Sequence, residues 1–303
     1  MKQFKLYSGH LKKVGLIIFA AFLVFNPFTV CPDIESSAFS SAASKDGVSI
    51  VFQDQGKGDI ALVFIHGWCC DRSYWRKQVP HFVLNYRVVT IDLAGHGDSG
   101  TKRKAWTMKA FGEDVAVVVK KLGLKKVILI GHSMGGAVIA EAAGLMPKKV
   151  IGLVGVDTFH NVELKYSTEQ INLIVAPVRA DFSKETKNHV RNFMFTSHSD
   201  PELVKKIAND MSSAPPKIGV ATLEAYLSND LLSTLKSVQA PTHCINSDRF
   251  PLTNIEVGRR HFHSFKVKLM SNVGHFNMIE DPETFNRLLD ETVKELIQLK
   301  KEK

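Results

Sequence analysis

The chain of 303 residues has a formal net charge of +9, with 45% hydrophobic and 23% charged residues. This composition is typical of a folded globular protein and excludes an intrinsically disordered chain. Part of the positive charge comes from lysines ahead of an N-terminal apolar segment, and the rest forms no long basic block, so we expect no nucleic-acid partner.

The N-terminal segment has the pattern of a targeting sequence. Residues 1–13 are basic, and residues 14–25 form an uncharged apolar run that is short for a bilayer span and typical of a secretory signal. The Ser/Ala-rich residues 36–44 that follow are expected to be a flexible linker. We therefore interpret residues 1–45 as a signal peptide or N-terminal membrane anchor with its linker, and expect the protein in the cell envelope or outside the cell. Whether the segment is cleaved, lipidated at Cys31 or retained stays open.

The cysteines do not form a metal-binding pattern. Neither a Cys-x-x-Cys pair nor a His/Cys ligand spacing occurs around Cys31, Cys69, Cys70 or Cys244. We therefore expect no metal, no cofactor and no disulfide framework.

Strand-like and helix-like segments alternate through the first half of the chain. The expected strands are residues 48–54, 60–65, 87–92, 127–130 and 150–157, and the expected helices are residues 73–84, 107–122 and 137–143. Several of the strands are apolar throughout, as strands covered by helices on both faces are. The alternation predicts an α/β fold with a mostly parallel, doubly wound sheet, and functional residues at the carboxyl ends of its strands.

The alternation is interrupted by a long helical insertion. Four amphipathic stretches occupy it, residues 167–180, 184–195, 201–212 and 217–236. Because the insertion begins where a strand ends, we interpret residues 158–238 as a helical lid, or cap, over the functional site. The core then comprises residues 46–157 and 239–303. Its second part contains expected strands at 240–246 and 265–270, and expected helices at 252–262 and 282–299.

A Gly-x-Ser-x-Gly segment, residues 131–135, stands between an expected strand and an expected helix. This is the context in which a serine is presented as a nucleophile. A side chain at Gly131 or Gly135 would strike the strand or the helix, so the turn needs both glycines. Ser133 is the candidate nucleophile, and the N–H of Met134 at the start of the helix can stabilise a developing oxyanion. The alternative is a glycine-rich turn that carries an incidental serine.

Four motifs together resemble the α/β-hydrolase fold superfamily, in particular its single-domain members with a helical cap. They are His66-Gly67, Asp92-Leu93-Ala94-Gly95-His96-Gly97-Asp98-Ser99, Gly131-His132-Ser133-Met134-Gly135-Gly136 and Gly274-His275-Phe276. The resemblance covers roughly residues 46–300. It implies a nucleophile, an acid and a histidine in chain order, by position Ser133, Asp248 and His275. It also implies an oxyanion hole formed by the backbone N–H groups of Trp68 and Met134.

The acid of this triad has two candidates. Asp248 lies just beyond an expected strand, where capped relatives usually carry the carboxylate, but the glycine that generally precedes it in those relatives is missing here. Asp157 ends the preceding strand, and some relatives have their acid at that strand. We favour Asp248, because the long insertion begins directly after Asp157 and because Asp248 follows the commoner order.

The resemblance implies a serine hydrolase that cleaves carboxylic esters or thioesters of small to medium, largely apolar molecules through an acyl-enzyme. Its partner would be a small-molecule ester, with membrane association through the N-terminal segment, and the oligomeric state is not predicted. A carbon–carbon bond hydrolase with the same triad is an alternative. So is a catalytically silent α/β-hydrolase that binds a ligand, since one fold serves many functions.

Overall fold

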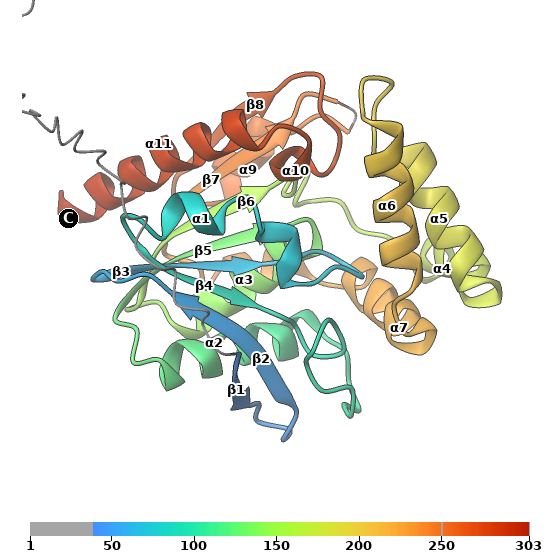
Figure 1. Ribbon diagram of the computed structural model, residues 1–303, viewed down its shortest axis with the longest axis horizontal. Coiled ribbons are helices and arrows are strands. Elements are labelled where there is room, and N and C mark those ends of the chain that lie inside the picture. The colour runs from blue at the N-terminus through green and yellow to red at the C-terminus, as the bar shows by residue number, and fades with distance from the viewer. Residues whose placement is uncertain (1–38, 250, 303) are drawn as a thin grey trace, which may run out of the picture. The chain divides into compact units, whose positions relative to one another are not determined.

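The computed structural model describes residues 39–249 and 251–302, most of them arranged around one sheet (Figure 1). Within these residues the sheet has eight strands in the order β1-β2-β4-β3-β5-β6-β7-β8. The strands are β1 (Ser40–Ala43), β2 (Ser49–Gln55), β3 (Ile60–Ile65), β4 (Arg87–Ile91), β5 (Lys126–His132), β6 (Val150–Val156), β7 (Thr242–Ser247) and β8 (Phe265–Met270). From β4 across to β8 all neighbours are parallel, whereas β2 is antiparallel to β4 and β1 to β2. The predicted mostly parallel sheet is confirmed.

Helices cover both faces of this sheet. On one face lie α1 (Val79–Phe82) and α11 (Pro282–Lys301), and on the other lie α2 (Met108–Lys121) and α3 (Met134–Leu145) (Figure 1). The shorter helices of the core are η1 (Arg72–Trp75), α9 (Ile255–His261) and α10 (Asn277–Glu280). Two neighbouring parallel strands must be joined by a crossover connection, which is usually a helix packed on one face of the sheet. The helices on both faces confirm the doubly wound α/β fold.

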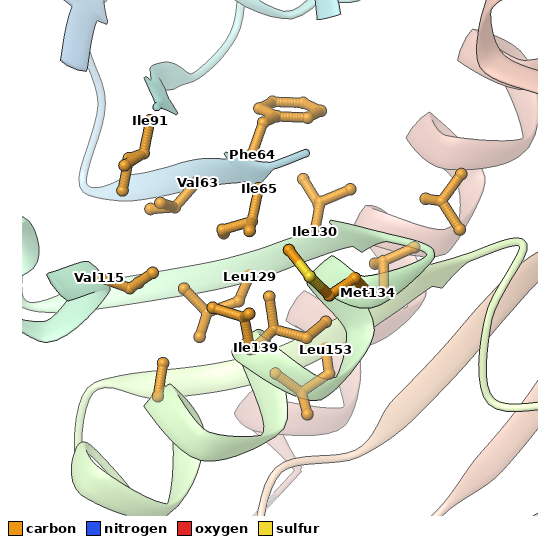
Figure 2. Packing of buried hydrophobic residues seen from close by; sticks show 14 of the residues in the cluster. Val63, Phe64, Ile65, Ile91, Val115, Leu129, Ile130, Met134, Ile139 and Leu153 are labelled. Atoms are coloured by element: carbon orange, nitrogen blue, oxygen red, sulfur yellow. The ribbon is translucent and has the colours of Figure 1, made fainter. Parts of the chain in front are cut away.

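The central strands carry uninterrupted apolar runs because both of their faces are buried. Figure 2 shows Val63 and Ile65 of β3 with Leu129 and Ile130 of β5, and Met134 at the start of α3 beside them. All five side chains are fully buried. Burial of one such side chain contributes about 1.5–3 kcal/mol. The end of β5 is therefore held rigidly, and so is the turn that follows it.

The Ser/Ala-rich segment contains an edge strand, so the prediction of a flexible linker is wrong for Ser40–Ala43. This strand, β1, pairs antiparallel with β2, with Ser40 opposite Phe52 and Ala43 opposite Ser49. Pairing at an edge uses backbone N–H and C=O groups, so it does not need the β-branched side chains on which strand prediction depends.

The predicted signal peptide or anchor falls largely on residues 1–38, outside the described residues, and it stays a prediction. Among the residues that the structure describes, no helix is long and apolar enough to cross a membrane.

Five helices follow one another between β6 and β7 in the described chain. They are α4 (Thr168–Ala180), α5 (Phe182–Phe193), α6 (Pro201–Ser212), α7 (Pro216–Leu227) and α8 (Leu231–Leu235), and we call them the cap. Side chains that precede the helices fix where they begin: Ser167 forms a capping box with Gln170, and Asp181 and Asp200 accept backbone N–H groups of α5 and α6. Figure 1 shows α4 to α7 grouped beyond one end of the sheet.

Candidate active site

Ser133 lies in a sharp turn between β5 and α3, with a φ angle of 53°. A non-glycine residue in this left-handed region costs on the order of 1–3 kcal/mol, so neighbouring contacts must hold it there. The Ser133 N–H donates to the carbonyl of Val156 at 3.0 Å, and the Thr158 hydroxyl donates to the Ser133 carbonyl at 2.9 Å. The turn is thus bonded to the end of β6 and to the residues that follow it.

The two glycines of the turn are required by close backbone contacts, as predicted. A Cβ on Gly131 would collide with the carbonyl group of Gly135, and a Cβ on Gly135 would lie 2.7 Å from the carbonyl oxygen of His66. Both obstacles are backbone atoms, which cannot move aside as a flexible side chain can. The loop after β3 therefore packs directly against the serine turn.

His275 and the buried Asp157 form a pair that lines the same cavity as Ser133. The Nδ1 atom of His275 is 2.6 Å from Oδ2 of Asp157, and the two side chains are 14% and 2% exposed. Asp157 directly follows β6, whereas His275 lies in the loop after β8. The backbone N–H and the hydroxyl of Ser247 donate to Oδ1 of Asp157 at 2.8 and 2.9 Å. Both carboxylate oxygens thus have partners.

The environment keeps Asp157 ionised. Burial alone would raise the pKa of this carboxyl, but the hydrogen bond and the charge of His275, together with the N–H of Ser247, outweigh it and hold the pKa below its usual value. A carboxylate fixed on Nδ1 leaves Nε2 of His275 as the ring nitrogen that can exchange a proton with another group.

Asp248 does not face His275, so its prediction as the acid is wrong, and the rival candidate Asp157 occupies that position. The Asp248 side chain is exposed and accepts a hydrogen bond from the Ser271 hydroxyl at 2.6 Å. Ser247, the last residue of β7, bonds Asp157, whereas Asp248 lies beyond the end of the strand and bonds Ser271.

The residues in place of the usual glycine, Asn246 and Ser247, hold the segment that carries Asp157. The side chain of Asn246 donates to the Thr158 carbonyl at 2.9 Å and accepts from the Thr158 N–H at 3.2 Å, while Ser247 bonds Asp157. Both side chains hold the turn after β6.

His66 supports the loops around the site. Its Nε2 accepts the Leu93 N–H at 3.0 Å, and its Nδ1 lies 2.8 Å from the carbonyl oxygen of Gly67, to which it donates. Burial lowers the pKa of His66 to about 4, so the ring is neutral near pH 7. The neutral His66 ring thus joins the loop after β3 to the loop after β4.

His132, next to Ser133 in sequence, holds the segment that carries His275. Its Nε2 donates to the His275 carbonyl at 2.9 Å, and burial lowers the pKa of His132 to about 3. A neutral His132 keeps this hydrogen bond without adding a second charge beside the His275 ring.

The two residues expected to form an oxyanion hole belong to the loop after β3 and to the start of α3. Met134 is the first residue of α3, and the N–H groups of a first helical turn have no acceptor within the helix. Trp68 follows Gly67, whose Cβ, if present, would lie 3.2 Å from the Cβ of Ser133. The Trp68 indole donates to the Gly219 carbonyl of α7 at 2.8 Å, which connects this loop to the cap.

Two cavities meet beside Ser133. The larger has a volume of about 620 Å³ and extends under α4, α5 and α7, and the smaller has about 250 Å³ and extends along residues 158–166 toward α8. Ser133, Asp157 and His275 line both of them. Residues of the cap such as Ile174 and Leu223 supply apolar walls to the larger cavity.

A serine in a strand–turn–helix motif, beside a buried aspartate–histidine pair at the carboxyl ends of parallel strands, defines the α/β-hydrolase class. The family model of the alpha/beta hydrolase fold matches residues 60–282. The chain belongs to this family.

Relatives in the family differ in activity. Over 106 residues the chain is 37% identical to a bifunctional esterase/perhydrolase of Acinetobacter calcoaceticus, a match that covers 34% of this chain and 38% of the relative. Over 249 residues it is 25% identical to the 3-oxoadipate enol-lactonase 1 of Acinetobacter baylyi, covering 78% of this chain and 89% of the relative. The chain spans between 28% and 38% of the length of that esterase/perhydrolase and of two acetyltransferase components of acetoin cleavage.

Solved structures share the same fold. A thermophilic esterase of Thermogutta terrifontis, solved with malate bound, superimposes with a TM-score of 0.75 at 23% identity, covering 86% of this chain and 99% of that chain. At this identity the likeness extends to the fold alone.

The tight turn at Ser133 predicts a steric response to Gly131→Ala. Because the new Cβ would meet backbone, we expect the free energy of unfolding to fall by about 1–3 kcal/mol in denaturant titrations. Gly100→Ala is the control, since its Cβ would lie 3.1 Å from the Val48 side chain and 3.3 Å from the Ser49 backbone nitrogen, so it meets no backbone collision like that at Gly131. An equal loss in the two variants would contradict this account of the turn.

Burial of neutral His66 predicts a pH-dependent stability. Since its pKa falls from 6.5 to about 4 on folding, the unfolded chain binds the additional proton between these values, and acidification through this range lowers the free energy of unfolding. His66→Gln keeps an acceptor for the Leu93 N–H but cannot titrate. The difference in the free energy of unfolding between the parent and His66→Gln should therefore become smaller as the pH falls from about 7 to about 4.5. If denaturant titrations give the same difference in the free energy of unfolding across this pH range, His66 is excluded as a source of the pH dependence.

Proposed function

We propose that the protein is a serine hydrolase that cleaves carboxylic esters or thioesters of small to medium, largely apolar molecules through an acyl-enzyme on Ser133. The observation that carries this proposal is the Asp157–His275 pair at 2.6 Å, which opens onto the same cavity as the strained serine turn. The similarity to an esterase/perhydrolase and to an enol-lactonase supports it, because a lactone is a cyclic ester.

The proposed reaction has two halves. His275 Nε2 takes the proton of the Ser133 hydroxyl as the oxygen attacks the carbonyl carbon, and then gives the proton to the leaving alcohol. Asp157 stabilises the charged imidazole that forms in between. Water, activated by His275, then attacks the acyl-enzyme and releases the acid.

The charge that develops on the carbonyl oxygen would be held by the backbone N–H groups of Trp68 and Met134. Loss of one such donor typically costs about 2.7–4 kcal/mol of transition-state stabilisation. Met134 is fully buried, and the Trp68 indole donates a hydrogen bond to the Gly219 carbonyl of α7. Both contacts support this role, since a preorganised donor needs no movement during the reaction.

Hydrolysis of p-nitrophenyl esters tests the proposal. Across acyl chains of increasing length the parent should release p-nitrophenolate, with a length optimum set by the apolar walls of the larger cavity. Ser133→Ala removes the nucleophile and should abolish turnover while leaving thermal unfolding close to that of the parent. Turnover by the alanine variant at the parent rate would exclude Ser133 as the nucleophile.

The two candidate acids can be separated by matched substitutions. Asp157→Asn removes the carboxylate that orients His275, and should lower kcat by several orders of magnitude, about 10⁴ in the serine-protease triad. Asp248→Asn changes an exposed side chain bonded to Ser271 and should leave kcat near the parent value. The opposite ranking of the two variants would return the role to Asp248.

A further inference from the structure

An arginine lines the larger cavity together with Ser133 and His275. Arg249 follows β7 by two residues, and its side chain is half-buried. Its Nε atom is buried and has no hydrogen-bond partner among residues 39–249 and 251–302. A buried donor without an acceptor is costly, and more so when it belongs to a charged group.

The carboxylates near Arg249 are bonded elsewhere. In the larger cavity Asp157 is paired with His275, and Glu185 accepts the Asn188 amide and lies 3.8 Å from Nζ of Lys184. Within the described chain, no carboxylate lies within ion-pair distance of the Arg249 guanidinium.

Two further carboxylates, those of Glu280 and Asp248, also have other hydrogen-bond partners. Glu280 accepts the Gly274 N–H at 2.8 Å and the Ser199 hydroxyl at 2.5 Å, and Asp248 accepts the Ser271 hydroxyl. The Arg249 charge contributes to the pKa of Glu280 only as a minor influence, after burial and these hydrogen bonds.

The histidines of the cavity do not neutralise this charge, since a histidine is either neutral or positive. Burial lowers the pKa of His160 and of His189, and the Arg249 charge lowers both further. The guanidinium thus faces the same space as these rings. The larger cavity thus holds a positive charge that forms no ion pair with a described carboxylate.

We propose that Arg249 binds a carboxylate of the substrate, so that the preferred substrates are esters or lactones with a second, acidic group. The proposal rests on the function proposed above and refines its substrate class. The planar guanidinium matches a carboxylate in a bidentate pair, and the carboxylate would balance its charge. A phosphate is less suited, because Arg249 is the one lysine or arginine among the described lining residues of the larger cavity.

The test compares p-nitrophenyl hemiglutarate, whose acyl chain ends in a carboxylate, with uncharged p-nitrophenyl pentanoate. The parent should have the higher kcat/KM for hemiglutarate. In Arg249→Gln the ratio of the two kcat/KM values should fall by about tenfold or more, since a charge-assisted hydrogen bond is lost. Arg249→Lys keeps the charge without the planar fork and should retain part of the preference.

Arg259→Gln is the matched control. This arginine belongs to α9, its side chain is 61% exposed, and it is paired with Glu256 at 2.8 Å outside the cavity. The control should leave the hemiglutarate-to-pentanoate ratio at the parent value. Thermal unfolding of each variant shows whether it is folded.

The outcomes separate the two proposals. A parent that hydrolyses both esters but prefers pentanoate, or an Arg249→Gln ratio equal to that of the parent, overturns the carboxylate site and leaves the hydrolase intact. A parent that hydrolyses neither these esters nor the neutral series overturns the hydrolase, and the substrate class with it. If Arg249→Gln does not fold, the parent preference and Arg249→Lys decide.

Discussion

The hydrogen bond between Asp157 and His275 is the contact on which the site depends. It joins the end of β6 to the loop after β8, across 118 positions of sequence. A buried aspartate is tolerated only when it is paired, and here Ser247 of β7 supplies the remaining donors. The Ser133 turn is bonded to the same end of β6. The reactive groups therefore reach their positions only when β5, β6, β7 and β8 are assembled in register.

The core and the cap contribute different kinds of side chains to the lining of the cavities. The core supplies Ser133, the Asp157–His275 pair and the guanidinium of Arg249. The cap supplies mainly apolar walls, and the bond from the Trp68 indole to the Gly219 carbonyl ties it to the loop beside Ser133. Functional side chains at the carboxyl ends of the strands are typical of α/β folds.

Much of this arrangement could be predicted from the sequence, because apolar runs of strand length and the glycines of the Ser133 turn have direct physical causes. The acid could not be chosen correctly, since Asp157 and Asp248 both follow strands and the direction of each side chain depends on bonds to Ser247 and Ser271. The edge strand Ser40–Ala43 was missed because backbone pairing leaves no apolar pattern. Arg249 belongs to no motif and becomes notable only when its surroundings are known.

A crystal structure of the protein after reaction with a fluorophosphonate ester tests the central claim most directly. The phosphorus should be bonded to Oγ of Ser133, with one phosphonyl oxygen within hydrogen-bond distance of the N–H groups of Trp68 and Met134. His275 Nε2 should face the adduct while Nδ1 remains on Asp157. An adduct on another residue, or a His275 ring bonded to Asp248 in that structure, would contradict the account.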